Sequence, residues 1–365
     1  MVKIILSGGG TGGHIYPAVA VAQALTKALG NKVDILFVGA EGRMESTTIP
    51  KLGYKIQCLP IAGLKRKFSL SNLLLPFKVL KSIRMAKKII REFQPQVVAG
   101  FGGYASAPIV WAAQKEGVPT VIQEQNSFAG LTNKLIARKA KSICVAWPNM
   151  ERFFPKRKIV YTGNPLRSSF SVEGLSRKDA LNHFGLDDSR AVVLVVGGSL
   201  GTRTLNEMMK RWIKNAGGYS PVQVIWQTGK YYWEEMHAFL ESHPTAGIWQ
   251  GAFIQRMDYA YQAATIVISR SGACSVSELC LAGKATIFVP SPNVAEDHQT
   301  KNAMSLVEKD AALMVADNVA PKQAMELAVE IANDSEKRES LENHIANLAT
   351  PNSAVDVAKE IIKYC

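Results

Sequence analysis

With 365 residues and 47% hydrophobic residues, the chain is too long for one ordinary domain and fits two domains of roughly 150 to 200 residues. Its net charge of +13 is uneven, because residues 1–163 hold 24 Lys and Arg against 7 Asp and Glu, whereas the rest holds 19 against 23. The five cysteines form no Cys-x-x-Cys pair, no apolar run approaches a membrane span, and glycines at position 8 precede any signal-peptide core. These features argue against a disulfide scaffold, an integral membrane protein and a secreted protein, and we expect a cytoplasmic protein.

Short apolar runs alternate with helical stretches along the whole chain, as in parallel sheets that helices cover on both faces. In the first half we expect strands at Lys3–Leu6, Val33–Val38, Lys55–Leu59, Gln96–Gly100, Thr120–Gln123 and Ser142–Val145. In the second half we expect strands at Val192–Val196, Val222–Gln227, Ile248–Gly251, Ile266–Ser269, Thr286–Val289 and Ala312–Val315. Six strands in each half predict an α/β protein with two doubly wound, Rossmann-like domains facing a cleft.

The domain boundary is expected after Tyr161-Thr-Gly163, because Asn164-Pro165 stops regular structure and a Ser-rich stretch follows. The N-terminal domain would comprise residues 1–163 and the C-terminal domain residues 164–350. The last segment, about 351–365, is expected to form an amphipathic helix that docks back on the first domain.

A glycine-rich turn follows the first expected strand of each half. The turn is Ser7-Gly-Gly-Gly-Thr-Gly-Gly-His14 in the first half and Gly197-Gly-Ser-Leu-Gly201 in the second. Glycine lets a ligand approach the backbone, and a helix N-terminus offers N–H groups to an anion such as a diphosphate. The two turns therefore predict two ligand-binding domains.

The first turn contains Gly8-x-Gly10-x-x-Gly13, which formally matches the dinucleotide fingerprint. That fingerprint also needs an acid about 20 residues further on, and Glu41 comes late. His14 is not part of the fingerprint. Because histidine titrates near neutral pH and is the commonest general base, we interpret His14 as a catalytic or ligand-binding residue; the alternative is a polar helix-start residue without chemistry.

The second turn also fits the Gly-x-Ser-x-Gly nucleophile elbow of hydrolases. Ser199 would be the nucleophile, and Asp258, or Asp297 with His298, could complete a triad. The first turn has no such serine, so the element common to both turns is an anion-binding backbone, which favours the anion-binding interpretation.

Other polar loops also follow expected strands, at the edge where open α/β sheets bind ligands. Gly102-Gly-Tyr104 and Glu124-Gln-Asn126 lie in the first half, although ordinary loop composition explains them nearly as well. In the second half, Ser275-x-x-Glu278 is either a helix-capping box or a set of phosphate and ribose ligands, and the residues alone do not separate the two. No Asp-x-Asp pair is present to hold a divalent ion, so a departing diphosphate would depend on helix ends and hydroxyls.

The segment Leu64–Arg91 contains nine basic residues and no acid, interleaved with leucine and phenylalanine. Such a segment is typical of binding to an anionic membrane surface, where each basic residue contributes about 1 kcal/mol. The alternative is a packed helix with a solvated basic face. Three leucines before Pro76-Phe77 favour the membrane, and the scarcity of aromatic residues argues against a nucleic-acid groove.

Taken together, these motifs resemble one family, the MurG glycosyltransferases of bacterial cell-wall synthesis. They are, in chain order, Gly9-Gly-Thr-Gly-Gly-His14, Gly102-Gly-Tyr104, Glu124-Gln-Asn126, Gly130-Leu-Thr-Asn133, Gly163-Asn-Pro-Leu-Arg167, Gly197-Gly-Ser199, Arg270-Ser-Gly272 with Glu278, and His298-Gln299. The resemblance implies a GT-B fold. It also implies an inverting transfer of GlcNAc from UDP-GlcNAc to the C4 hydroxyl of MurNAc-pentapeptide on an undecaprenyl diphosphate carrier, with no metal and no cofactor.

The resemblance further implies roles for individual residues. His14 would take the acceptor proton, with Glu124 as a supporting candidate, and Gly102, Gly103 and Tyr104 would lie near the acceptor diphosphate. Glu278 would bind the ribose. The family's two adjacent glutamines are His298-Gln299 here, so only Gln299 keeps its role. The residues that would contact UDP-GlcNAc are Thr11, Gly12, Gly13, Asn126, Arg167, Ser199, Ile254, Ala273, Cys274, Ser275, Val276, Ser277, Glu278 and Gln299.

On this interpretation the protein is a peripheral protein at the cytoplasmic face of the bacterial inner membrane, bound through Leu64–Arg91, with no nucleic-acid partner. A UDP-GlcNAc 2-epimerase of the same fold is the second hypothesis, and it would not need the basic segment. A hydrolase built on Ser199 is the third. A non-catalytic module that binds anionic lipid or nucleic acid is the last, and it would leave two glycine-rich turns without a purpose.

Overall fold

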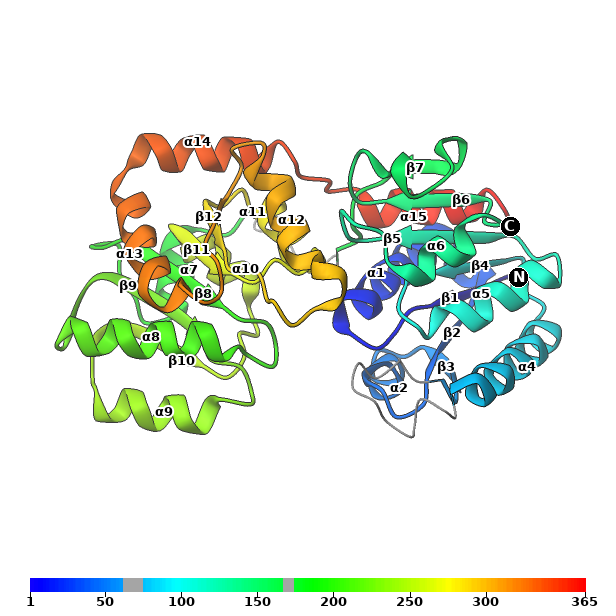
Figure 1. The fold of residues 1–365 in the computed structure, drawn as a ribbon, viewed down its shortest axis with the longest axis horizontal. Coiled ribbons are helices and arrows are strands. Elements are labelled where there is room, and N and C mark those ends of the chain that lie inside the picture. Colours follow the sequence, from blue (N-terminus) through cyan, green and yellow to red (C-terminus); the bar gives the residue numbers. More distant parts are fainter. Residues whose placement is uncertain (62–74, 167–173) are drawn as a thin grey trace. The chain divides into compact units, whose positions relative to one another are not determined.

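The computed structural model describes residues 1–61, 75–166 and 174–365. The chain divides into two compact units, Met1–Ser168 together with Thr350–Cys365, and Ser169–Ala349. Each unit is built on one parallel sheet with helices packed around it (Figure 1). The predicted fold class of two doubly wound, Rossmann-like domains is therefore confirmed.

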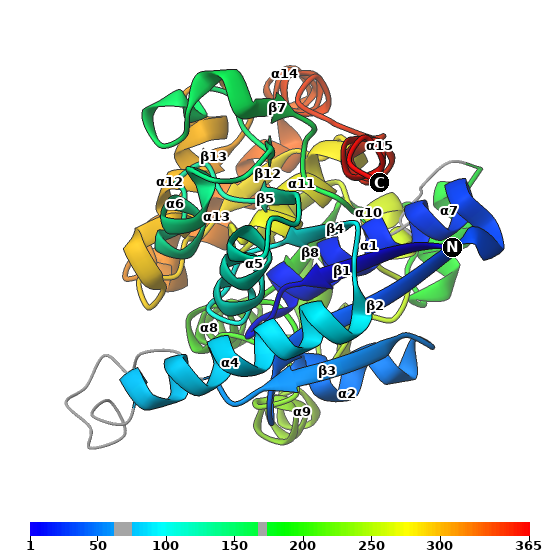
Figure 2. The same ribbon diagram turned by 90° about the vertical axis from the view of Figure 1, so that its right-hand side faces the viewer.

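The first unit has a seven-stranded sheet with the order β3-β2-β1-β4-β5-β6-β7. Its strands are β1 (Val2–Ser7), β2 (Val33–Ala40), β3 (Lys55–Leu59), β4 (Val97–Gly100), β5 (Thr120–Glu124), β6 (Ser142–Val145) and β7 (Ile159–Tyr161). Its helices are α1 (Gly12–Leu29), α2 (Met44–Lys51), α4 (Leu75–Phe93), α5 (Ser106–Lys115), α6 (Leu131–Ala137) and α15 (Ser353–Ile362). Helix α4 packs along α5 (Figure 2).

The second unit has a six-stranded sheet with the order β10-β9-β8-β11-β12-β13. Its strands are β8 (Val192–Val196), β9 (Tyr219–Gln227), β10 (Ala246–Gly251), β11 (Ile266–Ser269), β12 (Thr286–Phe288) and β13 (Leu313–Met314). Its helices are α7 (Arg177–His183), α8 (Arg203–Ala216), α9 (Trp233–Ser242), α10 (Met257–Ala263), α11 (Ala273–Ala282), α12 (His298–Val307), α13 (Ala320–Asn333) and α14 (Ser335–Ala346).

The first strand of each unit lies at the point where the strand order reverses. Strand β1 pairs with β2 on one side and β4 on the other, and β8 pairs with β9 and β11. Ser7 at the end of β1 is in register with Gly100, and Val196 at the end of β8 is in register with Ser269. In open α/β sheets ligands bind beyond the carboxyl ends of the strands at this point, which is where both glycine-rich turns begin.

The strands form because their residues suit a sheet that is covered on both faces. Ile4, Ile5 and Leu6 of β1 are all fully buried, although successive residues of a strand point to opposite faces. A sheet with one solvated face would instead show alternating polar residues. The continuous apolar run therefore already carries the information that helices cover both sides.

The terminal helix α15 belongs to the first unit although it follows the second unit in the sequence. Val357, Ala358 and Ile361 are buried in the same core as residues of α1 and β1 (Figure 1, red helix). At β6, the Ser142 hydroxyl donates to a Glu360 oxygen at 2.5 Å. The helix thus closes one side of the first unit.

The structure differs from the expected elements in one additional strand and in the bounds of several others. The first sheet has a seventh strand, β7, which the sequence analysis missed because it is only three residues long and follows a run of exposed basic residues. Strand β13 covers only Leu313–Met314 of the expected Ala312–Val315.

Residues 64–74 of the basic segment lie outside the described residues, and residues 75–91 belong to α4. In the part of the chain described, no helix has both the length and the apolar character that a membrane span requires.

Candidate active site

The first glycine-rich turn leads directly into α1 and presents His14 in the first turn of that helix. Thr11 is the N-cap residue and has an extended backbone. Its hydroxyl lies 3.1 Å from His14 Nδ1, so the two side chains orient each other. His14 is half-buried, whereas Thr11 is exposed. The imidazole is therefore held at the carboxyl edge of the sheet with a defined ring orientation.

Gly102 and Gly103 pack against His14 and the first turn. Both have positive φ, 85° and 75°, which side-chain-bearing residues rarely adopt. A methyl carbon at Gly102 would lie 3.1 Å from His14 Cδ2, and one at Gly103 would lie 2.3 Å from the Gly9 carbonyl oxygen. These two motifs, 90 residues apart in the sequence, therefore form one surface around His14.

Tyr104 covers the other side of the first turn. A methyl carbon at Gly10 would lie 3.0 Å from Cε1 of the Tyr104 ring. Burial raises the pKa of the Tyr104 phenol, the Arg43 guanidinium lowers it, and Glu45 raises it, with a net upward shift. Tyr104 is thus a neutral hydrogen-bonding group near neutral pH.

Glu124 is buried and holds the loop after β5 together. Its carboxylate accepts hydrogen bonds from the Asn126 N–H (3.0 Å), the Gly130 N–H (3.0 Å) and Asn133 Nδ2 (2.9 Å), and Asn126 Nδ2 adds a fourth donor at 3.2 Å. Burial raises its pKa, against the opposing effect of these hydrogen bonds. With four donors on two oxygens, the carboxylate is suited to ordering the loop rather than to accepting a proton from a substrate.

The sequence analysis missed a further acid at this edge, Glu45 of α2. It is 1% exposed, and its carboxylate accepts hydrogen bonds from the Gly10 and Ala40 N–H groups. Its signal in the sequence was weak, because an acid in the first turn of a short helix is expected from the helix dipole alone.

The second glycine-rich turn lies at the carboxyl edge of the other sheet and is shaped by backbone contacts. Gly201 has φ +81°, and a methyl carbon there would lie 2.0 Å from the Thr228 carbonyl oxygen. Gln227 at the end of β9 donates to the Gly198 carbonyl (3.0 Å) and accepts from the Ile254 N–H (2.9 Å). Ser199 is exposed on this turn. The turn, Gln227 and Ile254 therefore form one connected structure.

Helix α11 carries most of the residues that the resemblance assigned to the donor. It begins at Ala273 after the N-cap residue Gly272, so Ser275 lies inside the helix and the capping-box hypothesis is wrong. Glu278 instead accepts a hydrogen bond from the Tyr261 hydroxyl at 3.3 Å. Burial raises the pKa of Tyr261 well above its usual value, and Glu278 adds to that rise, so Tyr261 stays a donor to the carboxylate. The helix carries Ala273, Cys274, Ser275, Val276, Ser277 and Glu278.

Gln299 of α12 is bonded to two neighbouring loops of the second unit. Its Oε1 accepts from the Ser291 N–H (2.9 Å), and its backbone carbonyl accepts from the Ser271 hydroxyl (2.8 Å). Next to Ser271, Arg270 pairs with Asp317 at 2.5 Å. His298 is the first residue of α12. Gln299 therefore lies at the same sheet edge as α11, as a supporting residue of the loops around it.

The structure does not assemble the serine triad. Asp258 is paired with Arg256 at 2.6 Å, and Asp297 accepts from the Thr300 hydroxyl at 2.7 Å, so both acids have other partners.

Arg167, an expected ligand of UDP-GlcNAc, lies outside the described residues. Among the residues that are described, no group of three or more His, Cys, Asp or Glu side chains could hold a metal ion.

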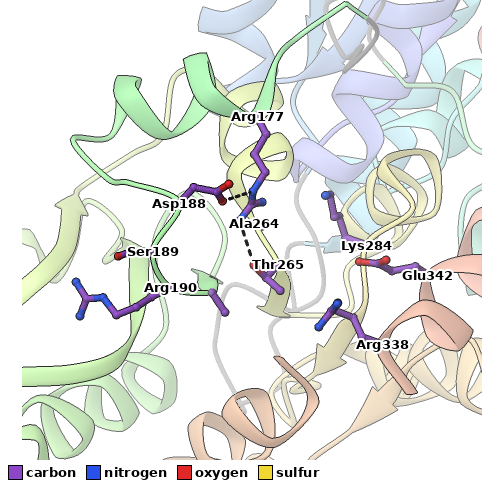
Figure 3. Close-up of a pocket in the computed structure, with 10 residues that line it drawn as sticks. Arg177, Asp188, Ser189, Arg190, Ala264, Thr265, Lys284, Arg338 and Glu342 are labelled. Atoms are coloured by element: carbon purple, nitrogen blue, oxygen red, sulfur yellow. Dashed lines mark hydrogen bonds and ion pairs between the residues drawn. The ribbon is translucent and has the colours of Figure 1, made fainter. Parts of the chain in front are cut away.

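A cavity of about 390 Å³ lies elsewhere in the second unit (Figure 3). Ala191, Thr265 and Lys284 on its wall each precede a strand, so the cavity is at the amino edge of the sheet, opposite the glycine-rich turn. Arg177 pairs with Asp188 at 3.1 Å there and also donates to Thr265 (Figure 3). None of the expected site residues lines this cavity.

The fold, with a glycine-rich turn at the carboxyl edge of each sheet, defines a class, the two-domain α/β proteins of the GT-B type. Residues 4–145 match the model of the glycosyltransferase family 28 N-terminal domain, and residues 192–361 match the model of the glycosyltransferase family 28 C-terminal domain. The chain belongs to glycosyltransferase family 28 and, within it, to the MurG family.

Curated relatives match over nearly the whole chain. A protein of Parabacteroides distasonis is 51% identical over 99% of this chain and 98% of its own length, and one of Porphyromonas gingivalis is 49% identical over 99% and 95%. Both are named UDP-N-acetylglucosamine--N-acetylmuramyl-(pentapeptide) pyrophosphoryl-undecaprenol N-acetylglucosamine transferase.

A solved structure supports the same family assignment. The crystal structure of Acinetobacter baumannii MurG matches with a TM-score of 0.78 and 31% identity over the full length of both chains. A UDP-GlcNAc 2-epimerase from Neisseria meningitidis matches with a TM-score of 0.69 but only 14% identity, over 99% of this chain and all of its own. The second likeness shows the shared fold alone, so the epimerase hypothesis is not favoured.

Proposed function

We infer that this protein is a UDP-sugar-dependent N-acetylglucosaminyltransferase that moves GlcNAc from UDP-GlcNAc to lipid-linked MurNAc-pentapeptide, the lipid I to lipid II step of peptidoglycan synthesis. The observation that carries this conclusion is the identity of about half of all residues, over the full length, with relatives that bear the name of that activity. Neither the epimerase nor the Ser199 hydrolase has comparable support.

We further propose that the transfer inverts the anomeric carbon and that His14 is the base. In an inverting displacement, one group removes the proton of the attacking hydroxyl while the nucleotide departs from the opposite face. The contact of the Thr11 hydroxyl with Nδ1 at 3.1 Å supports this role, because it orients the imidazole that would take the proton from the acceptor C4 hydroxyl. Gly102 and Gly103 support it too, since the lack of side chains there lets their backbone pack closely against the ring and hold it in place.

Glu124 is proposed to act through the loop that it orders, and not as the base. Its four donors come from Asn126, Gly130 and Asn133, which all belong to the motifs shared with the family. Loss of the carboxylate would release Asn126, a proposed donor ligand. Tyr104, with Gly102 and Gly103, is proposed to lie near the acceptor diphosphate.

The second unit is proposed to bind the donor. The N-terminus of α11 and the turn at Gly197–Gly201 offer backbone N–H groups to the UDP diphosphate, and hydroxyls of Ser199, Ser275 and Ser277 add donors. Glu278 is proposed to accept from the ribose hydroxyls. Stabilisation of the leaving UDP by these groups would make a metal unnecessary. The full set of proposed donor ligands remains the one stated from the sequence, with Thr11, Gly12 and Gly13 from the first unit.

We propose that the first unit also binds the cytoplasmic face of an anionic membrane. Phe77 and Leu80 of α4 are 71% and 54% exposed, and Leu131 and Leu135 of α6 are 63% and 73% exposed. Lys87 and Lys115 lie over the half-exposed Trp111 of α5, at 5.8 and 5.4 Å from the ring centre. Exposed apolar residues beside basic residues suit the interface of an anionic bilayer.

The activity is tested by measuring UDP release from UDP-GlcNAc, with and without a lipid-linked muramoyl acceptor, in the presence of EDTA. Release that requires the acceptor and ignores EDTA supports the proposed reaction and its independence of metal. UDP release without acceptor, or formation of a ManNAc product, would contradict it.

Membrane binding is tested by sedimentation with vesicles of anionic or neutral lipid. The double variant Phe77→Ser/Leu80→Ser should bind anionic vesicles more weakly than the parent protein, at unchanged affinity for UDP-GlcNAc. Leu52→Ser is the control, because Leu52 is 45% exposed but does not belong to α4. This variant should bind anionic vesicles like the parent protein. Equal binding of all three proteins would overturn the assignment to α4.

A further inference from the structure

The cavity at the amino edge of the second sheet has no role in the proposed reaction (Figure 3). Its volume of about 390 Å³ lies within the range of pockets that hold small metabolites. The first residue of α7, two residues of α14 and three loops that lead into β8, β11 and β12 form its wall, and all of them belong to the second unit. The chemistry of this wall therefore indicates what the cavity can hold.

Positive charge dominates the wall of the cavity. Four basic side chains and two acidic ones line it, so the acids can neutralise at most half of the positive charge. The basic residues are all half-buried, whereas Asp188 is 77% exposed and its charge is well solvated. The basic residues are Arg177, Arg190, Lys284 and Arg338, and the acidic residues are Asp188 and Glu342.

Lys284 is the basic residue whose charge lacks a partner. Within the described residues, its Nζ makes no hydrogen bond, and no carboxylate oxygen lies within 4 Å of it. Burial lowers the pKa of this ammonium group, while Glu342 opposes that shift and Arg177 adds to it. An ammonium group that is partly removed from water without a partner is costly, so an anion that enters the cavity would be bound favourably there.

Two arginines of the same wall are held in position and retain hydrogen-bond donors. Arg177 donates through Nε to Asp188 at 3.1 Å and through Nη2 to the Thr265 hydroxyl at 3.3 Å. Arg338 donates through Nη1 to the Ala332 carbonyl at 2.7 Å. A guanidinium has five N–H donors, so each arginine keeps donors for a further acceptor. Because these side chains are already ordered, binding a phosphate to them would cost little side-chain entropy.

We propose that this cavity is a binding site for a small phosphorylated metabolite that carries hydroxyl groups. Its phosphate would bind Lys284 together with the arginines, since Figure 3 shows Arg177 on one side of Thr265 and Lys284 with Arg338 on the other. The Glu342 carboxylate would accept hydrogen bonds from the hydroxyl groups of the ligand. This site is separate from the proposed donor site, which lies at the opposite edge of the sheet, and the inference does not depend on the proposed reaction.

The main test is Lys284→Gln, which removes the charge and keeps most of the length of the side chain. Ribose 5-phosphate is titrated by calorimetry into protein saturated with UDP, so that the proposed donor site is filled. The variant should bind ribose 5-phosphate at least about tenfold more weakly than the parent protein, because a hydrogen bond to a charged group is lost. Lys322→Gln, at an exposed lysine of α13 outside the cavity, is the matched control and should bind like the parent protein.

A second variant should have the opposite effect. Glu342→Gln removes a negative charge from the wall, so it should bind inorganic phosphate roughly threefold more tightly than the parent protein does. A misfolded protein would not bind more tightly, so this result separates a binding role from a loss of structure. In the parent protein, ribose 5-phosphate should bind more tightly than inorganic phosphate, and ribose alone should not bind.

The outcomes decide the inference without reference to glycosyl transfer. Equal binding of ribose 5-phosphate by the parent protein, Lys284→Gln and Lys322→Gln would overturn it. It would also be overturned if Glu342→Gln bound phosphate no more tightly than the parent protein. If Lys284→Gln lost its cooperative thermal unfolding, the titration of Glu342→Gln would decide alone. The proposed function fails separately, if the parent protein releases no UDP with the lipid-linked acceptor.

Discussion

The two glycine-rich turns of this protein follow equivalent strands, β1 and β8, but different groups hold them. The first is held by a carboxylate, Glu45, which bonds the Gly10 N–H. The second is held by backbone packing, since Gly201 meets the Thr228 carbonyl and Gly229. A similar sequence pattern at the same place in a fold is therefore held by a charged side chain in one unit and by backbone packing in the other. We propose a division of labour on this basis, with proton removal from the acceptor at the first turn and binding of the donor diphosphate at the second.

The comparison is tested most strongly by His14→Ala at the first turn. Removing this proposed base should lower turnover by roughly 10²- to 10⁴-fold, with little change in donor affinity, because general base catalysis contributes on that scale. Steady-state UDP release and UDP-GlcNAc binding measure the two effects. His237→Ala, at a half-exposed histidine of α9, is the control. Near-normal turnover would remove the base role from the first turn.

At the second turn, Gly201→Ala should have the opposite effect. Its methyl carbon would lie 2.0 Å from the Thr228 carbonyl, so the turn must move, and donor affinity should fall by about 100-fold, or about 2.7 kcal/mol. Gly198→Ala is a matched control, because φ is also positive there, +83°, but no atom lies within 4 Å of the added carbon. Equal donor affinities in the two variants, measured by calorimetry, would show that the close approach is unimportant.

Glu278→Gln sharpens the assignment of the donor to α11. Loss of the charged acceptor should raise the KM for UDP-GlcNAc by roughly 10- to 100-fold and leave the acceptor KM nearly unchanged, because a hydrogen bond to a charged group contributes about 1.5–3 kcal/mol. Glu207→Gln on α8, where the acid pairs with Lys210 near the surface, should leave both constants unchanged. A change in the acceptor KM alone would contradict the division between the turns.

The smallest expected effect concerns α15, which closes the first unit but not the second. Glu360 is buried, which opposes ionisation, but hydrogen bonds from Lys363 and Ser142 hold its pKa below the usual value. A carboxyl group whose pKa is lower in the folded state stabilises the protein at pH values above its usual pKa, which is near 4.5 for Glu360. This stabilisation is lost as the pH falls through the folded-state pKa.

Glu360→Gln should therefore lower the free energy of unfolding at pH 7 by about 1 kcal/mol, a modest amount because Lys363 is 63% exposed and solvent screens its charge. In urea titrations the difference from the parent protein should shrink below pH 4.5. Glu92→Gln on α4, an exposed acid 3.6 Å from Lys88, should show no such difference. If the difference in the free energy of unfolding between Glu360→Gln and the parent protein persisted at low pH, it would come from packing and not from the charge of Glu360.

Much of the fold was predictable because its signal is local. Lys55–Leu59, Ser142–Val145, Val192–Val196 and Ile266–Ser269 are strands with the expected bounds. The last three are short, mostly apolar runs between loops, which is sufficient to define a strand buried on both faces, whereas Lys55–Leu59 is an edge strand whose polar and apolar residues alternate. Strand β7 was missed because a three-residue strand with exposed neighbours has no such run.

Local signals did not decide between a helix-capping box and a ligand-binding loop at the start of α11. Ser275-x-x-Glu278 has the spacing of a capping box. In the structure, however, Gly272 is the N-cap residue and Ser275 lies inside α11. The register of a helix start depends on where the preceding strand ends and on which backbone N–H groups remain to be bonded, and the spacing of two side chains does not contain that information.

By itself, the sequence determined the fold class and the family, because strand runs, glycine-rich turns and motif order are properties of the chain. Only the tertiary structure decided which groups surround each turn. Glu45 reaches Gly10 across 35 residues, and Gly102 and Gly103 reach His14 across about 90, through the parallel register of β1 with β2 and β4. That register brings together strand ends that are far apart in the chain, so the character of each turn follows from packing and not from its own residues.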